Sequence, residues 1–263
     1  MLYVSLFFVE KLFAFCIFLN KLIKDMFILF VMMLLFVDKP TWMTSYGVIR
    51  RLKKNFPGQK IWHAGTLDPL ATGLLILWIG KDTKQLGQLI WLDKSYVAKI
   101  DLSQGTDTRD SDFWQDHRVG NVSVQWEKSF FVHPITMKSV DVPSQDQIEN
   151  LLAEMLKVHE FPLPPFCAKK QWGKKLYDLA KEWHAVLETR PMKVYSSRLI
   201  TYAFPLVDVE FFVWSGCYIR SLAYWLGQQL WMWGIIVSLR RISIGHYTVE
   251  DAKSLEEIEK MKV

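Results

Sequence analysis

Asp68 is the residue whose type and setting best suit chemistry, within the stretch WHAGTLDPLATGLLILWIG (residues 62–80). Pro69 biases Asp68 towards an extended or turn conformation, and Gly65 permits unusual backbone angles just before it. A carboxylate in such a constrained loop can act as a nucleophile or as an electrostatic stabiliser. Spacing alone favours a different interpretation, an Asx-type turn or a helix cap, which is the usual reason for an aspartate in a loop.

The elements that must position this acid can be predicted from the hydrophobic pattern. Residues 44–58 form a short helix that a Thr-Ser pair caps and a Pro-Gly pair stops. The apolar run at 74–80 indicates a buried strand. A further strand is expected at LLFV, near residue 34, just before DKP. Residues 94–102 alternate as a half-buried strand, with Tyr96 on the apolar face.

Downstream of these elements the pattern is more varied. A capping box of Ser144 and Gln147 starts a helix, and the chain closes with a strand and a short helix. That helix is predicted at 144–158, and it is followed by a proline-led basic loop at 162–175, a strand at 207–214 and a helix at 218–230. Because strands and helices do not alternate regularly, we expect an α+β fold with a mixed, largely antiparallel sheet and flanking helices.

Composition limits the class of protein only broadly. The 263 residues carry 51% hydrophobic and 22% charged side chains, which is typical of a globular protein with a sizeable core. The net charge of +5 permits a polyanionic partner, and the basic run at 50–54 is either a solvated helix face or a phosphate contact. Three scattered cysteines and six dispersed histidines indicate neither a disulfide framework nor a metal site.

The first 32 residues form a separate, hydrophobic N-terminal extension. The longest clean apolar run, at 26–37, continues past the end of this extension and is 12 residues long, which is too short for the roughly 20 that span a bilayer. Three interpretations stay open: a membrane-attached segment, a capping helix, or translated sequence upstream of the true start. The last is favoured, so the folded domain is expected to comprise residues 33–263.

Seven blocks in a fixed order carry a resemblance to a known family. They are DKP..MTS (38–45), HAGTLDPLATGLL (63–75), GKDTK (80–84), DKSYVA (93–98), GTDTRDSD (105–112), PPFCAKKQWGKKLYDLA (164–180) and GCYIRSLA (216–223). Together they resemble the TruB family of tRNA pseudouridine synthases, and the likeness runs from about residue 33 to 253. The resemblance implies the pseudouridine synthase fold, with no cofactor and no metal.

The resemblance also implies a reaction and its catalytic residues. A uridine at position 55, in the T loop of tRNA, becomes pseudouridine when the glycosidic bond moves from N1 to C5 of the base. Asp68 matches the catalytic aspartate of the family, and Arg220 of the YIR motif would pair with it and keep it ionised. Tyr96 would stack on the target base. The alternatives are a solvent-facing first-turn arginine and an ordinary core tyrosine.

Five further residues are candidates for substrate binding. His63 matches the family histidine that occupies the space of the flipped nucleotide, and Tyr218 would line the same pocket. Lys39 and Lys84 are candidates for contacts to the RNA backbone, and Leu222 for a contact in the pocket. A lone loop histidine or lysine is otherwise more often a surface residue.

Tryptophan stands where the family usually has glycine at Trp42, Trp62, Trp183 and Trp231, in a chain with 12 tryptophans. Tryptophan is costly where the backbone needs a positive φ or a close approach. Trp62 directly precedes His63 and is the change expected to disturb the catalytic loop most. Cys217 and Trp225 also depart from the usual threonine and aspartate.

The sequence therefore predicts a cytoplasmic isomerase that makes pseudouridine in tRNA. It implies no stable protein partner, and the small C-terminal RNA-binding domain of many family members is expected to be absent or vestigial. The main alternative is a catalytically impaired protein that binds or folds tRNA, because the tryptophans could impair the site. A weaker alternative is a membrane-associated protein that acts through residues 1–32.

Overall fold

A computed structural model describes most of the chain from Met33 onwards. The described residues are 33–80, 84–103, 105–106, 108–111, 142–164, 166–167, 169–171, 173–175 and 188–261. The proposed extension at 1–32 lies outside them, so its separation from the rest of the chain stays a prediction. Within the described residues, no helix is long and apolar enough to cross a membrane.

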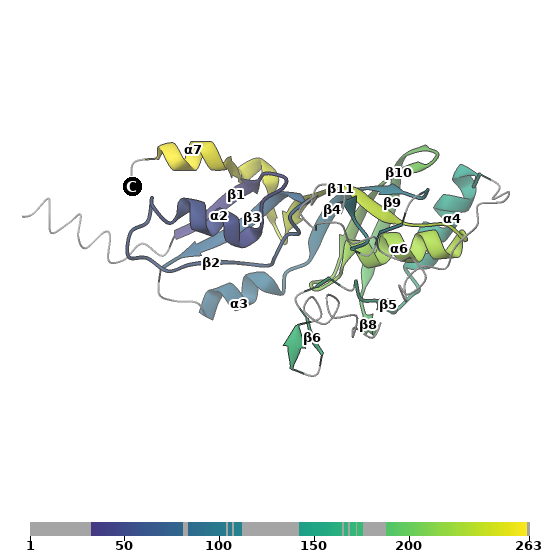
Figure 1. Cartoon of the computed structure of the whole chain (residues 1–263), viewed down its shortest axis with the longest axis horizontal. Helices are drawn as coiled ribbons and strands as arrows, with labels where there is room; N and C mark the ends of the chain where they lie inside the picture. The colour runs from purple at the N-terminus through teal and green to yellow at the C-terminus, as the bar shows by residue number, and fades with distance from the viewer. Residues whose placement is uncertain are drawn as a thin grey trace, which may run out of the picture.

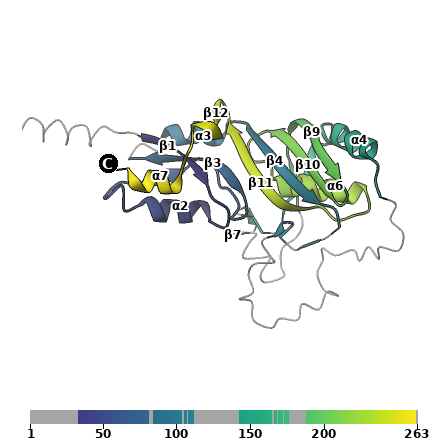
Figure 2. The ribbon, with the colours of Figure 1, turned by 90° about the horizontal axis from the view of Figure 1, so that it is seen from above.

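A curved sheet forms the centre of the described structure (Figures 1 and 2). Its strands are β1 (Met33–Lys39), β2 (Ile61–His63), β3 (Thr72–Ile79), β4 (Lys94–Asp101), β9 (Val194–Ala203), β10 (Leu206–Val213), β11 (Ile235–Ile244), β12 (Tyr247–Thr248) and β13 (Lys253–Ser254). The main order is β13-β1-β3-β11-β4-β10-β9, with β2 paired to β3 and β12 to β11. The β1–β13 and β3–β11 pairs are parallel and the others antiparallel, as the sequence predicts.

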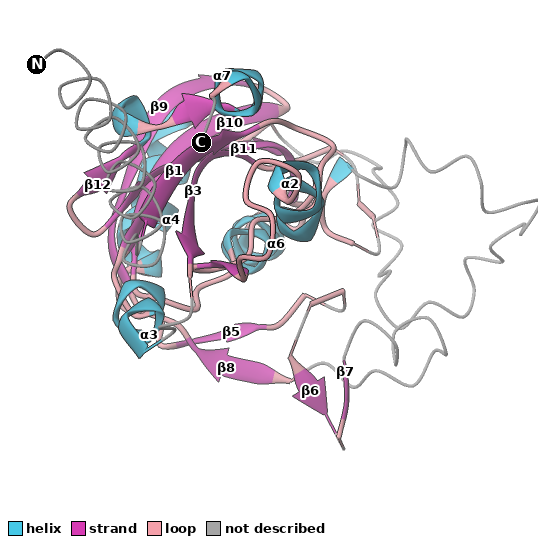
Figure 3. Ribbon diagram, turned by 90° about the vertical axis from the view of Figure 1, so that its left-hand side faces the viewer, coloured by secondary structure: helices cyan, strands magenta, loops and turns pink. Residues whose placement is uncertain are grey.

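Two short ribbons lie apart from this sheet. They are formed by β5 (Glu160–Pro162) with β8 (Thr189–Pro191), and by β6 (Lys170–Gln171) with β7 (Lys174–Lys175). The second ribbon lies within the proline-led basic segment at 162–175 that the sequence predicts as a loop, whereas β5 begins just before that segment and β8 follows it. In the end-on view of Figure 3 they extend below the curve of the main sheet.

The described helices confirm the predicted ones and add one. They are α2 (Ser45–Leu52), α3 (Lys84–Ile90), α4 (Gln145–Met155), α6 (Ile219–Gln229) and α7 (Leu255–Lys260), with a 3-10 turn η3 (Val249–Asp251). Thr44 caps α2 by accepting from the backbone N–H of Gly47, and α4 begins with the predicted capping box. The sequence analysis missed α3, and α2 ends at Leu52, earlier than the predicted Pro-Gly stop.

Both faces of β3 are buried, which explains its uninterrupted apolar sequence. Leu75 and Leu77 join the large core cluster, which includes residues of α2, α4 and α6. Leu74 and Ile76 join a smaller cluster with Leu89 of α3. Figure 3 shows α2 and α6 inside the curve of the sheet and α3 outside it. The strand that follows the Asp68 loop is therefore packed on both faces.

The two halves of the sheet meet at a short parallel contact between β3 and β11. Thr72 pairs with Arg240 and Gly73 with Arg241, and β11 then continues along β4. Gly73 has a φ of +99°, and a Cβ at this position would lie 2.3 Å from the carbonyl oxygen of Arg241. Only glycine lets the strands approach this closely, so Gly73 fixes the place where Arg241 meets β3.

The basic run of α2 packs against the C-terminal helix. Arg51 makes ion pairs with Glu256 and Glu259 of α7, and Lys54 pairs with Glu259. These hydrogen bonds lower the pKa of Glu259 to about 2. Arg51 and Lys54 therefore meet acidic groups of the same chain while their side chains stay partly exposed, and the alternative of a phosphate contact stays a prediction.

Candidate active site

The loop at 64–71, between β2 and β3, carries Asp68 and is held through its backbone. Gly65 adopts a φ of +93°, and the amide of Ala71 donates to the carbonyl of Asp68 at 3.1 Å. Five other carbonyls of the loop accept hydrogen bonds from side chains of distant segments. The donors are Arg241 (Gly65 and Thr66 oxygens, 3.2 and 3.4 Å), Ser45 (Leu67, 3.1 Å), Lys39 (Pro69, 3.1 Å) and Thr41 (Leu70, 2.9 Å). Such an anchored loop presents its one acid in a defined direction.

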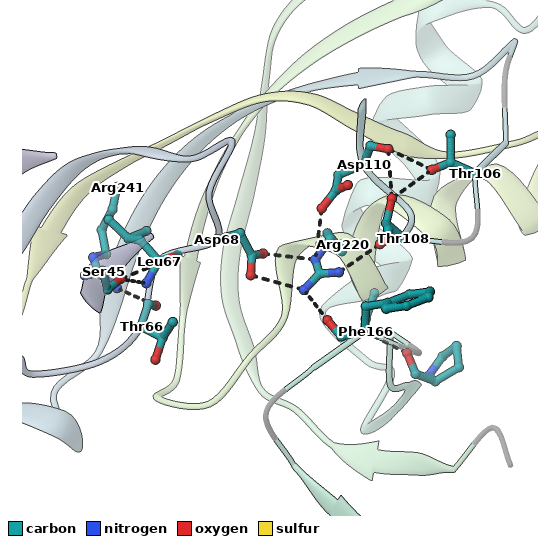
Figure 4. A network of polar contacts seen from close by, with 12 residues as sticks. Ser45, Thr66, Leu67, Asp68, Thr106, Thr108, Asp110, Phe166, Arg220 and Arg241 are labelled. Atoms are coloured by element: carbon teal, nitrogen blue, oxygen red, sulfur yellow. Dashed lines mark hydrogen bonds and ion pairs between the residues drawn. The ribbon is translucent and has the colours of Figure 1, made fainter. Parts of the chain in front are cut away.

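Arg220, in the first turn of α6, holds the carboxylate of Asp68 (Figure 4). Its Nη2 donates to Oδ1 of Asp68 at 3.1 Å, and its Nε lies 2.9 Å from Oδ2. The Arg220 side chain is 5% exposed, whereas that of Asp68 is 32% exposed. The guanidinium thus fixes the acid from the buried side while part of the carboxylate stays accessible. The alternative of a solvent-facing arginine is wrong.

Other groups of a buried polar network complete the surroundings of Arg220. Its Nη1 donates to the carbonyl of Thr108 at 2.8 Å, and its Nη2 donates to that of Phe166 at 3.0 Å. Its Nε also lies 3.6 Å from Oδ2 of Asp110, whose side chain is 5% exposed. Burial by itself lowers the pKa of Arg220, but the charges of Asp68 and Asp110 more than offset this, and the pKa is raised.

Tyr96 lies in β4, directly opposite Arg241 of β11. Opposite residues of paired strands share a face, so the Tyr96 ring is on the face where Arg241 reaches the Asp68 loop. The ring is 7% exposed and belongs to the same core cluster as Leu67 and Leu70. This placement fits a wall of the site, and the stacking role of Tyr96 stays a prediction.

His63 ends β2, immediately before the loop, and is half-buried. Burial, and then the positive charge of Arg241, lower its pKa. The imidazole is therefore neutral at neutral pH. Its Nδ1 is buried and has no hydrogen-bond partner among the described residues. Tyr218, at the N-cap of α6, is half-buried, and burial with a hydrogen bond to Cys167 raises its pKa.

Two predicted substrate contacts are wrong in this structure. Lys39 is fully buried, and its ammonium donates to the carbonyls of Pro40, Met43 and Pro69. It braces the backbone and does not reach an RNA phosphate. Leu222 is also fully buried and packs in the large core cluster. Lys84 is the first residue of α3, and its side chain lies outside the described residues.

Sequence reasoning missed three residues that shape the site. Asp110 lies in the quoted block GTDTRDSD without a predicted role, and Ser45, in DKP..MTS, is predicted only as a possible helix cap. Arg241 follows the last quoted block, in SLRRISIG, and is 1% exposed. Their polar type within strongly patterned segments was the available signal. Only the contacts at 65–68 and at Arg220 show what they do.

Two of the four tryptophans occupy glycine-like backbone positions. Trp42 has a φ of 61° and Trp231 a φ of 55°, and both rings are exposed. Trp62 instead lies in the extended strand β2 and is 49% exposed. Because neighbouring side chains of a strand point to opposite faces, Trp62 points away from His63, so the expected disturbance of the loop is wrong. Trp183 lies outside the described residues.

The other two departures are accommodated by ordinary packing. Cys217 is half-buried, and its thiol donates to the carbonyl of Lys193 at 3.4 Å. Trp225 meets the edge of the Phe161 ring at a centroid distance of 6.1 Å. In the part of the chain that the structure describes, no three His, Cys, Asp or Glu side chains gather as ligands for a metal ion.

Solved structures share the fold. The chain superposes on one from a Cbf5-Nop10-Gar1 complex with a TM-score of 0.60 and 24% identity, over 89% of this chain and 55% of that one. A chain of the archaeal box H/ACA sRNP Nop10-Cbf5 complex matches with a TM-score of 0.56 and 22% identity, over 86% and 52%. This chain thus spans about half the length of those chains. The fold is the α+β fold of pseudouridine synthases.

Sequence comparison identifies the family. The model of the "TruB family pseudouridylate synthase (N terminal domain)" matches residues 53–219. The tRNA pseudouridine synthase B of Aquifex aeolicus is 36% identical over 228 residues, which are 85% of this chain and 72% of that protein. That of Mycobacterium tuberculosis H37Rv is 34% identical over 227 residues, 84% of this chain and 70% of that protein. The chain belongs to the TruB family.

Proposed function

We propose that this chain isomerises uridine to pseudouridine in the T loop of tRNA, with Asp68 as the catalytic carboxylate. The observation that carries the proposal is the pair of Asp68 and Arg220, in which a buried guanidinium aims a partly exposed carboxylate. The relatives named tRNA pseudouridine synthase B support the reaction and the class of substrate.

The reaction breaks the bond between N1 of uracil and C1′ of the ribose and forms a bond between C5 and C1′. In balance, C5 loses its proton and N1 gains one. A carboxylate beside C1′ either attacks this carbon or stabilises the positive charge that develops there. Both routes need an oxygen of Asp68 in a fixed position. Arg220 supplies this by binding both carboxylate oxygens from behind.

The groups around Asp68 suit a flipped base. Extruding a stacked nucleotide costs a few kcal/mol, which contacts in the site must repay. We place the Tyr96 ring against the base, the neutral imidazole of His63 at the position that the base leaves, and Tyr218 along the pocket. The lowered pKa of His63 supports a role in packing and hydrogen bonding rather than in phosphate binding.

A direct assay tests the catalytic claim in the full chain. An unmodified tRNA transcript is incubated with the protein, and pseudouridine is mapped by reverse-transcription stops after carbodiimide treatment. We expect product in the T loop, and a fall in rate of at least about a thousandfold for Asp68→Asn. Asp146→Asn is the matched control, because Asp146 is an exposed acid in the first turn of α4.

Each result has a definite meaning. Full activity of Asp68→Asn would refute the role of the carboxylate, and product at another position would refute the T loop. A wild-type protein that binds the transcript tightly without forming product would support the alternative of a tRNA-binding or tRNA-folding protein. We place the activity in the cytoplasm, where its substrate is found.

A further inference from the structure

Among the described residues, one edge of β3 has no strand partner over three residues, next to the Asp68 loop. On this edge β2 pairs with residues 77–79 of β3, and β11 pairs with 72–73. In the gap, the carbonyl of Ile76 accepts from the amide of Ala64 at 2.9 Å. The carbonyl of Leu74, a fully buried residue, accepts from Nε of Arg241 at 2.7 Å. Arg241 thus supplies the hydrogen bond that a neighbouring strand would have made.

The rest of the same guanidinium reaches the start of the loop. Its Nη2 lies 3.2 Å from the carbonyl oxygen of Gly65, and its Nη1 lies 3.4 Å from that of Thr66. A guanidinium is planar and presents its donors in a fixed fork. One rigid group therefore connects the edge of β3 to the backbone two and three residues before Asp68.

The surroundings of Arg241 argue against a role in stability alone. The residue is 1% exposed, and among the described residues its hydrogen bonds all go to backbone carbonyls. Burying a charge without a counter-ion destabilises the folded state, and even buried ion pairs are often replaced by apolar side chains of similar volume without loss of stability. The directed donors of Arg241, rather than its bulk, therefore explain the presence of a cation here.

We propose that Arg241 is a positioning residue for the isomerisation, which sets the backbone of the loop so that Asp68 meets the ribose carbon. This inference rests on the proposed function, because it needs a reaction at Asp68. Arg241 acts through the loop and makes no contact with the RNA. The remainder of the loop is held independently by Ser45, Lys39 and Thr41.

The charge of Arg241 has a second effect on the same loop. After burial, it is the second cause of the lowered pKa of His63, the residue that precedes the loop. One residue thus contacts the loop and, together with burial, lowers the pKa of the imidazole beside it. Both effects act on the segment at 63–68, although Arg241 is 175 residues away from Thr66 in the chain.

The variant Arg241→Gln separates the two kinds of contact. The side-chain nitrogen of glutamine occupies the place of the arginine Nε, so a donor for the Leu74 carbonyl is kept, while the donors for Gly65 and Thr66 are lost. Arg240→Gln is the matched control. Arg240 is adjacent in β11, but it pairs with Asp38 at 2.8 and 3.0 Å instead of contacting the loop. Arg241→Lys, which keeps the charge, serves if the glutamine variant does not fold.

Three measurements are made on the full chain: the single-turnover rate of pseudouridine formation, the Kd for a tRNA transcript, and hydrogen exchange of the backbone amides at 63–74. We expect Arg241→Gln to lower the rate by about 10- to 100-fold, since a small displacement of a catalytic group has this effect. The Kd should change by less than about threefold, because binding groups are untouched. The loop amides should exchange about tenfold faster than in Arg240→Gln.

The outcomes separate this inference from the proposed function. If hydrogen exchange of the loop amides were unchanged in the Arg241 variants, Arg241 would not hold the loop. If exchange were faster but the rate of pseudouridine formation unchanged, Arg241 would not be a positioning residue. Equal losses of rate in Arg240→Gln and Arg241→Gln would also overturn it. A wild-type protein that makes no pseudouridine would refute the proposed function, while the exchange measurement would still decide whether Arg241 holds the loop.

Discussion

Two buried arginines lie on either side of Asp68, and their surroundings are opposite in kind. Arg220, in α6, faces the carboxylates of Asp68 and Asp110. Arg241, in β11, donates to the carbonyls of Gly65, Thr66 and Leu74. One arginine thus fixes the direction of the Asp68 side chain, and the other fixes the backbone that carries it.

The two arginines differ in the charges that surround them, and each contributes in its own way to the position of Asp68. The positive charge of Arg220 is balanced, and the pKa of its guanidinium is raised because the attraction of two carboxylates offsets burial. A second buried arginine, Arg109, lies near Arg220, so two cations face two carboxylates there. The buried charge next to Arg241 is another cation, Lys94, whose pKa burial and then Arg241 lower to about 8. We therefore expect the two regions to respond differently to substitution and to pH.

The largest effect on activity among the next predictions is expected from weakening the contacts between Arg220 and Asp68. In Arg220→Lys, one ammonium replaces a fork that reaches Asp68, Thr108 and Phe166 together, so the carboxylate loses its fixed direction. We expect kcat for pseudouridine formation to fall by about 10²- to 10³-fold, the usual loss for a preorganised donor. Steady-state kinetics on a tRNA transcript measure this.

A surface arginine provides the control for that variant. Arg198→Lys alters an exposed ion pair with Glu210, and such pairs contribute little. Its kcat should equal that of the wild type. If Arg220→Lys kept more than about a third of the wild-type kcat, the ion pair with Asp68 would not be the feature that positions the acid.

A smaller effect, on stability, is expected in the region of Arg241 and Lys94. Lys94 is 5% exposed, and its ammonium donates to the carbonyls of Ile90 and Leu92 and to the hydroxyl of Ser215. Its folded pKa of about 8 lies below the ordinary 10.5, so between these values the unfolded chain binds more protons. The free energy of unfolding contributed by Lys94 therefore rises with pH from about 8 to 10.5.

Denaturant titrations of the wild type and Lys94→Met at several pH values test this sign. The wild type should gain roughly 1–2 kcal/mol relative to the variant across this window. The groups that face Lys94 are Arg241, Asp93 and Cys217. Burial raises the pKa of Cys217 to about 11, so its contribution to stability falls above pH 9 in both proteins. Because the charge of Lys94 lowers that pKa, the fall is at least as large in Lys94→Met, and the expected sign of the difference is kept. A difference that stays flat or falls with pH would contradict the prediction.

The smallest expected effect is on stability, in two exposed turns that contain Trp42 and Trp231. The turn of Trp42 adjoins Lys39, which holds the Asp68 loop. Trp42 lies between Pro40 and Met43, whose carbonyls accept from Lys39, and Trp231 follows α6. Both have a positive φ, which costs a residue with a Cβ about 1–2 kcal/mol. We expect Trp42→Gly and Trp231→Gly each to raise the free energy of unfolding by about 1 kcal/mol, or the Tm by about 2–4 °C.

Trp62→Gly is the control for these two variants. Trp62 is also exposed, but it lies in β2, where glycine weakens a strand by roughly 0.5–1 kcal/mol. Thermal unfolding should therefore show a lower Tm for Trp62→Gly and a higher one for the other two. A common direction of change in all three would contradict the claim that backbone conformation decides the effect.

The sequence predicted those parts of the fold that rest on local patterns. The strands at β1, β3, β4 and β10 and the helices α2, α4 and α6 follow from apolar periodicity and from caps at Thr44 and Ser144. The short strands β2, β5 and β8 escaped prediction. Their residues pair only because the tertiary structure brings the partners together, and three residues carry too little periodicity to be recognised.

The candidate site was predicted in part for a similar reason. Motif resemblance nominated Asp68 and Arg220, which the structure brings into contact across 152 residues of sequence. It also nominated Lys39 and Leu222 as substrate contacts, and their complete burial excludes this. A motif records that a residue is needed, but it does not say whether the side chain faces the substrate or braces the backbone.

By itself, the sequence determined that an acid stands in a constrained turn before a buried strand, and that the chain forms a mixed α+β sheet. The tertiary structure alone decided what holds the acid. Arg220 and Arg241 come from distant parts of the chain, and both act because water is excluded around them. In that setting each buried charge or carbonyl must find a partner within the protein, and here those partners converge on Asp68 and the loop that carries it.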